Sequence, residues 1–172
     1  MTTANKITLA RIVMIPVFLL LAYANKPFWA LAVYVIACIS DALDGYIARH
    51  YNQISNFGKF VDPLADKVLV LSAMCFFVER GLMPGWCVAI ILLREFAVSG
   101  LRLIAVEQRR VIAAAWSGKI KTACTMVGLG LLLVFPTVHL VNIICVSCIL
   151  ITTVYSGIEY FYVNRDVLKD VD

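Results

Sequence analysis

The chain contains six long apolar stretches separated by short polar breaks, and this pattern restricts its possible folds more than any other feature. A helix that crosses the hydrocarbon core of a bilayer, about 30 Å thick, needs roughly 20 mostly apolar residues. The stretches that suit this length are residues 7–24, 29–49, 58–78, 84–105, 118–135 and 139–163. Isolated sheet edges do not exist in hydrocarbon, so these stretches predict helices. We therefore expect an all-α, polytopic integral membrane protein with six transmembrane helices.

Composition supports a lipid environment. Of the 172 residues, 62% are hydrophobic and only 15% are charged, which is too few to cover a soluble domain with a charged shell. Six crossings with short connections use the whole chain, so residues 1–172 are expected to form a single transmembrane domain. The formal net charge of +4 is too small to indicate nucleic acid as a partner, and the expected environment is the lipid bilayer.

The positions of the basic residues predict the orientation of the spans. With the N-terminus in the cytoplasm, the outer loops carry only Lys26 and Arg80. The inner side then holds Lys6, Arg11, Arg49, Lys59, Arg109, Arg110, Lys119, Lys121, Arg165 and Lys169. This asymmetry follows the positive-inside rule and predicts that both termini are cytoplasmic. We expect a multi-pass protein of the cell inner (cytoplasmic) membrane, with its polar site facing the cytoplasm.

Four of the eleven acidic residues lie close together, at Asp41, Asp44, Asp62 and Asp66. Spacings of three and four residues put each pair on one face of its helix. In an antiparallel hairpin that turns near Gln53, Asp44 lies level with Asp62, and Asp41 lies level with Asp66 about one turn deeper. The spacing therefore predicts that four carboxylates converge on one small volume.

Such a cluster repels itself in a low dielectric unless it is protonated, paired with Lys or Arg, or bound to cations. Helix capping and interfacial salt bridges could account for two of the four aspartates. They do not account for four aspartates that lie level with one another in pairs. Carboxylate oxygens are hard ligands that suit Mg²⁺, Mn²⁺ or Ca²⁺ rather than zinc. The sequence therefore predicts a divalent-cation site at the cytoplasmic ends of the second and third helices.

The residues around the aspartates form a longer pattern. It reads Asp41-x2-Asp44-Gly45-x2-Ala48-Arg49-x8-Gly58-x3-Asp62-x3-Asp66. This pattern resembles, at every fixed position, the signature of the CDP-alcohol phosphotransferases, whose architecture also has six spans. Three further segments resemble bacterial phosphatidylglycerophosphate synthases: Asn5-x2-Thr8-Leu9-x-Arg11, Arg94-Glu95-Phe96 with Ser99-x-Leu101-Arg102, and Ala115-Trp116-x-Gly118-Lys119-x-Lys121-Thr122. Together the matches cover most of residues 5–122.

The resemblance implies a transferase of phospholipid biosynthesis. Such an enzyme moves the phosphatidyl group of CDP-diacylglycerol to sn-glycerol 3-phosphate and releases CMP. The implied cofactor is Mg²⁺ or Mn²⁺, held by Asp41, Asp44 and Asp62 with Asp66 as a further ligand. Asp66 is also the implied general base for the acceptor hydroxyl, which requires one of its oxygens to stay off the metal. The resemblance also implies a homodimer.

Two further groups of residues are predicted to bind the nucleotide and the acceptor phosphate. The resemblance assigns the cytidine nucleotide to Asn5, Thr8, Gly45, Arg49 and Ser55. The acceptor phosphate requires cations, and buried arginines within a span are usually functional. The predicted acceptor-phosphate residues are Arg94, Arg102, Lys119 and Lys121.

Two alternatives stay open at this point. A sibling enzyme could use another acceptor, such as inositol phosphate, serine or a phospholipid, although the basic set favours a phosphorylated one. Intramembrane carboxylates also mark ion-coupled transporters, but transporter sites usually lie near the membrane midplane on broken helices. Here the predicted carboxylates lie within about two turns of the cytoplasmic face.

Overall fold

The computed structural model describes residues 3–50, 56–108, 110, 112 and 115–169, and among them it contains helices and no strand. Side chains at 3–7, 41–50, 56–64, 66, 168 and 169 lie outside the description. The helices are α1 (Thr3–Tyr23), α2 (Pro27–His50), α3 (Asn56–Glu79), α4 (Gly85–Glu107), α5 (Trp116–Val134), α6 (His139–Val163) and α7 (Asp166–Lys169). Each predicted span coincides with one long helix. The largest difference is at the first helix, expected from residue 7 and observed from Thr3.

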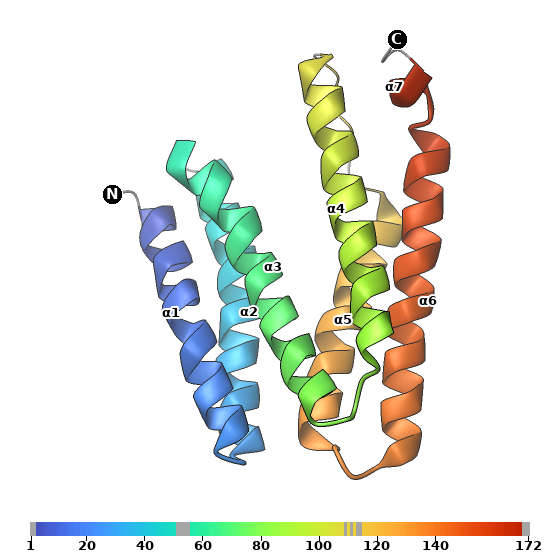
Figure 1. Ribbon diagram of the computed structural model, residues 1–172. Coiled ribbons are helices and arrows are strands. Elements are labelled where there is room, and N and C mark those ends of the chain that lie inside the picture. Colours follow the sequence, from blue (N-terminus) through green and yellow to red (C-terminus); the bar gives the residue numbers. More distant parts are fainter. Residues whose placement is uncertain (1–2, 51–55, 109, 111, 113–114, 170–172) are drawn as a thin grey trace.

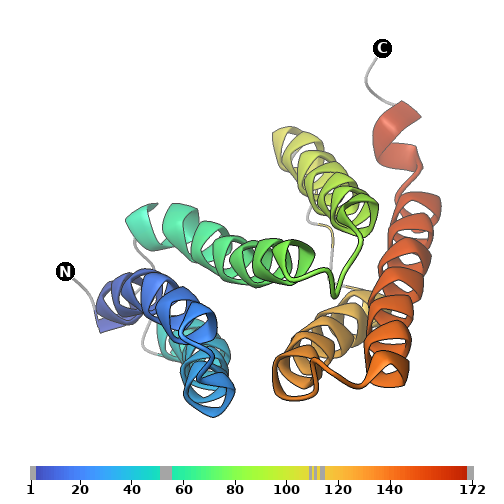
Figure 2. The same cartoon turned by 60° about the horizontal axis from the view of Figure 1, so that its bottom comes forward.

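The six long helices run alternately up and down, and the two chain ends lie at the same end of the bundle (Figure 1). They form two groups of three. In the first group α1 packs against both α2 and α3, and in the second α6 packs against both α4 and α5. Figure 2 shows that α3 leans from the first group towards the second, and α3 contacts both α4 and α5.

Buried positions recur every three or four residues along each helix of the first group, which is the pattern of helices packed along a shared seam. On α1 these positions are Thr8, Arg11, Ile15, Phe18 and Ala22. On α2 they are Ala30, Tyr34 and Ala37. The small residues at the seam allow the backbones to approach closely. The seam is apolar along most of its length and becomes polar towards the N-terminal end of α1.

The main apolar core joins all six long helices and includes Phe18, Phe77, Ile91, Leu132 and Ile149. A second, smaller cluster packs α4 against α6 and α7. The apolar core therefore ties the two groups together.

At the lower end of Figure 1, the α3–α4 turn passes through Gly81, whose φ of 70° is a left-handed conformation that glycine adopts without strain.

The outer surface of the bundle is strongly apolar. Leu20, Phe28 and Leu93 are each more than 70% exposed, on three different helices. Apolar surface of this extent is characteristic of a surface that faces lipid or a partner. Within the described residues, two helices are long and apolar enough to cross a membrane, α5 and α6, and shorter apolar stretches occupy Thr8–Tyr23 and Pro27–Ser40. The helical architecture is thus confirmed, while six crossings and cytoplasmic termini stay predictions.

Candidate functional site

The four aspartates lie on the last turns of α2 and the first turns of α3, which are the two helix ends joined by the 51–55 connection. Positions 41 and 44 continue the three-and-four spacing of the buried α2 residues that ends at Ala37. Positions 62 and 66 likewise precede Leu69 and Ala73, which are buried on α3. The backbone therefore places all four positions on the buried stripes of their helices. Their carboxylates lie outside the described side chains, so the predicted convergence stays a prediction.

The N-terminal helix brings a buried cation close to this hairpin. Arg11 is 0% exposed, and Thr8, one turn earlier, is 1% exposed. The Arg11 Nε donates to Ser40 Oγ at 3.4 Å, and Ser40 in turn donates to the Ala37 carbonyl at 2.7 Å. Ser40 directly precedes Asp41 in sequence, so Arg11 contacts α2 one residue before the first position of the signature. Sequence reasoning placed Arg11 in a motif but not among the site residues. The sequence signal that could have added Arg11 to the site was its position on the same face of the helix as Thr8.

The other predicted nucleotide residues are placed only in part. Asn5, Gly45 and Arg49 lie in helices, but their side chains are outside the description, and Ser55 lies outside the described residues altogether. Among the side chains that are described, no group of three or more His, Cys, Asp or Glu could hold a metal. That search does not include the four aspartates, whose oxygen donors are the type that Mg²⁺ and Mn²⁺ accept.

A second polar cluster joins α4 and α5. The Glu95 Oε1 accepts from Lys121 Nζ at 2.5 Å and from Arg94 Nη1 at 3.0 Å. The exposed fractions of these side chains are 9% for Lys121, 13% for Arg94 and 22% for Glu95. A charge that is removed from water needs a partner, and each of the three has one here. Two of the predicted acceptor-phosphate residues are therefore brought together by a carboxylate that was not among the predicted site residues.

The Arg94 side chain is also fixed by α6. Its Nη2 donates to Ser156 Oγ at 2.9 Å. A Cβ added to Gly157 would lie 3.0 Å from Arg94 Cγ, and one added to Gly118 would lie 3.9 Å from Nη2. The absence of a side chain at Gly157 therefore makes room for the arginine, whereas a Cβ at Gly118 would only touch it at an ordinary contact distance.

A further link connects this cluster to α3. Lys67 Nζ donates to Ser99 Oγ at 2.6 Å, and Ser99 donates to the Glu95 carbonyl at 2.8 Å. Lys67 directly follows Asp66, the predicted general base. Side chains from four helices, α3 to α6, are therefore joined through one turn of α4.

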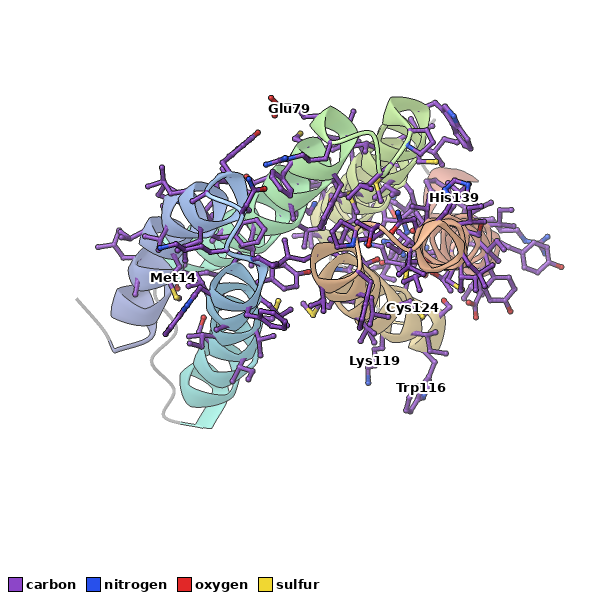
Figure 3. The ribbon with its side chains drawn as sticks, turned by 90° about the horizontal axis from the view of Figure 1, so that it is seen from below. Met14, Glu79, Trp116, Lys119, Cys124 and His139 are labelled. Atoms are coloured by element: carbon purple, nitrogen blue, oxygen red, sulfur yellow. The ribbon has the colours of Figure 1, made fainter. Side chains whose placement is uncertain are left out.

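The remaining two predicted acceptor residues lie apart from Lys121. The exposed Arg102 donates from Nε to the Tyr160 hydroxyl at 3.0 Å. The exposed Lys119 has its ammonium 4.9 Å from the centre of the Trp116 ring, and Figure 3 shows both side chains pointing away from the bundle. Two residues along a helix correspond to a rotation of about 200°. This is why Lys119 and Lys121 occupy different faces of α5.

A cavity of about 470 Å³ lies at the other end of the bundle, between the α3–α4 and α5–α6 turns. Its lining includes Trp86, His139 and Asn142, and it contains no carboxylate. Figure 3 shows His139 at this end, at the start of α6. The cavity therefore has no part in the acidic and basic set described above.

The four acidic positions of α2 and α3, the basic cluster of α4 and α5 and the apolar outer surface thus belong to one helical bundle. The family model described as CDP-alcohol phosphatidyltransferase matches residues 1–155, and the chain belongs to this family. The chain is 40% identical to the CDP-diacylglycerol–glycerol-3-phosphate 3-phosphatidyltransferase of Bacillus subtilis, with 96% of each chain covered. It is 35% identical to the Escherichia coli protein of the same name, with 95% of each covered. It is also 40% identical to a probable phosphatidylglycerophosphate synthase of Mycobacterium tuberculosis, covering 91% of this chain and 78% of the relative.

Proposed function

We propose that this protein transfers the phosphatidyl group of CDP-diacylglycerol to sn-glycerol 3-phosphate, forming phosphatidylglycerol phosphate and CMP. Family membership and the names of full-length relatives support the reaction. The structural observation that carries the choice of acceptor is the pair of half-buried Arg94 and buried Lys121, from two helices, on one carboxylate. Two adjacent cations of this kind suit a phosphate dianion better than serine, a zwitterion that carries no net charge.

The reaction breaks the bond between the phosphatidyl phosphorus and the bridging oxygen of the diphosphate, and forms a bond to the primary hydroxyl of the acceptor. Asp66 takes the proton from that hydroxyl, and CMP leaves with the bridging oxygen. Arg94 and Lys121 hold the acceptor phosphate, with Arg102 nearer the cytoplasmic end of α4. Asn5, Thr8, Gly45, Arg49 and Ser55 hold the nucleotide. Lys119 is left out of the phosphate site because its ammonium lies over Trp116 on an exposed face.

The aspartates suit a divalent metal, and we propose Mg²⁺ or Mn²⁺ on Asp41, Asp44, Asp62 and Asp66. Four carboxylates at two neighbouring helix ends supply only hard oxygen donors, which is the ligand set these ions prefer. When bound, the metal would neutralise the charge of the diphosphate and the negative charge that develops on the phosphate of the departing CMP.

We further propose that the six long helices cross the inner membrane, with both termini and the site on the cytoplasmic side. The apolar outer surface, the common end of the two termini and the distribution of basic residues support this orientation. The homodimer implied by the family resemblance is part of the same proposal.

The test is to purify the full chain and supply CDP-diacylglycerol with sn-glycerol 3-phosphate, serine, inositol phosphate or a phospholipid in turn. We expect CMP and phosphatidylglycerol phosphate with glycerol 3-phosphate only. Activity should disappear with a chelator and return with Mg²⁺ or Mn²⁺. Release of CMP with a different acceptor would replace the proposed reaction by a sibling reaction.

A further inference from the structure

We propose that Glu95 is a positioning residue that holds Arg94 and Lys121 at the spacing the acceptor phosphate needs. The inference rests on the proposed function and assigns a role to a residue outside the predicted site. Glu95 does not itself touch the reacting atoms in this proposal. It acts through the two cations that it holds.

The geometry around Glu95 carries the first step. Arg94 and Lys121 belong to α4 and α5, and both donate to the same oxygen, Glu95 Oε1. Both are long side chains with many rotamers, and a lysine near a membrane surface readily extends its ammonium towards water. Lys119, two residues away, is exposed and lies over Trp116. Lys121 lies on the face of α5 that meets α4, and there the carboxylate of Glu95 holds its ammonium inside.

The charges of Glu95, Arg94 and Lys121 give a second reason for this role. Two buried cations on one carboxylate leave the cluster with one net positive charge in a site of low exposure. The carboxylate therefore offsets the repulsion between Arg94 and Lys121 before any ligand is present. A phosphate dianion brings several acceptor oxygens and can bond both cations in the positions they already occupy. Because the two side chains are ordered in advance, less conformational entropy is lost on binding.

The same turn of α4 reaches the helix of the general base. The Glu95 carbonyl accepts from Ser99, whose hydroxyl accepts from Lys67, the neighbour of Asp66. Glu95 thus lies between the cations proposed for the acceptor phosphate and the helix proposed to activate the acceptor hydroxyl. With Glu95 fixed, the phosphate of a small acceptor stays beside the two cations while its hydroxyl stays beside the helix of the general base.

The first experiment compares Glu95→Gln with the unmodified full chain. Glutamine keeps the size of the side chain and removes its charge. We expect the KM for sn-glycerol 3-phosphate to rise about tenfold, while the KM for CDP-diacylglycerol stays within about twofold. Glu95→Asp retains the charge on a shorter side chain and should raise the acceptor KM less than Glu95→Gln does. Glu107→Gln is the matched control, because Glu107 is an exposed carboxylate at the end of the same helix.

The second experiment is a double-mutant cycle with Lys121→Met. If Glu95 acts through the two cations, Glu95→Gln should raise the acceptor KM clearly less in the Lys121→Met variant than in the unmodified chain, because only its contact with Arg94 is left to lose. Multiplying effects would overturn the proposal, since they would mean that the carboxylate acts elsewhere. A fall in the acceptor KM of Glu95→Gln would also overturn it, because the carboxylate would then only repel the phosphate.

These outcomes separate the inference from the proposed function. If the unmodified chain makes no phosphatidylglycerol phosphate, the proposed function is wrong. If it makes the product and Glu95→Gln leaves the acceptor KM unchanged, the inference alone is wrong. Should Glu95→Gln fail to fold, the same comparison is made with Glu95→Asp. That variant should show an intermediate rise in acceptor KM, and an unchanged value would sink the inference.

Discussion

The two three-helix groups of this bundle carry different clusters of charged residues at the same end. The first group, α1 to α3, carries four aspartates within 26 residues of sequence and one arginine, Arg11, on the facing stripe of α1. The second group, α4 to α6, carries Arg94 and Lys121 and contains its own counter-charge in Glu95. The acidic side is chemically suited to cations from solution, whereas the basic side is already neutralised in part by the protein.

This difference has a physical reason. The divalent metal proposed for the carboxylates would stay bound through the whole catalytic cycle, so those carboxylates need no further partner. A phosphate acceptor arrives and leaves in each cycle, and two buried cations without a partner between cycles would repel one another. An internal carboxylate keeps them in place. The four predictions below test this contrast, from the largest expected effect to the smallest.

Asp66→Asn should have the largest effect. Removing the proposed general base, and one metal ligand with it, should lower kcat by roughly 10²–10⁴-fold because proton transfer contributes about that much. The measurement is CMP release from CDP-diacylglycerol with saturating acceptor. Retention of more than a tenth of the activity would show that Asp66 is not the base.

Lys121→Met and Lys119→Met test the basic side directly. Loss of a buried cation that bonds phosphate should raise the acceptor KM by about 10- to 100-fold, in line with about 1.5–3 kcal/mol for a charged hydrogen bond. The exposed Lys119 should change it by less than about twofold. The two lysines are matched in chemistry and lie on one helix, so equal effects would contradict the separation of faces seen here.

Gly157→Ala should act on Arg94 by crowding. The new Cβ would lie 3.0 Å from Arg94 Cγ, so the arginine has to shift. We expect a cost of about 1–3 kcal/mol in stability or acceptor binding, as in other overpacked sites. Thermal unfolding and the acceptor KM are the measurements. Gly100→Ala is the control, since nothing lies within 4 Å of its added Cβ; a similar loss in that variant would remove the argument from crowding.

Ser40→Ala should have the smallest effect, on the acidic side. It removes the hydroxyl that accepts from Arg11 at 3.4 Å and leaves the helix intact. The expected loss is about 0.5–1.5 kcal/mol of stability, the usual contribution of one hydrogen bond. It is measured by thermal unfolding with and without Mg²⁺. Ser40→Ala could instead lower the free energy of unfolding by as much as Lys121→Met lowers the free energy of acceptor binding. The acidic side would then depend on the Arg11–Ser40 contact as strongly as the basic side depends on Lys121.

Much of the fold and of the family followed from sequence. The six helices are confirmed, and membership of the predicted family is confirmed by a match over residues 1–155. The small helix α7 was not predicted, because its four residues are too few to produce a periodic pattern. The grouping of Lys119 with Lys121 is not supported, because neighbours in sequence turn to different faces of a helix.

The sequence by itself determined where helices form and which four acidic positions share their faces, because helical periodicity is a local property that spacing reveals. Only the tertiary structure decided that Glu95 joins Arg94 to Lys121, that Arg94 lies beside Gly157 of α6, and that Arg11 is fully buried. These contacts join residues from separate helices. Long charged side chains can reach several partners, and the packing of the helices selects one of them.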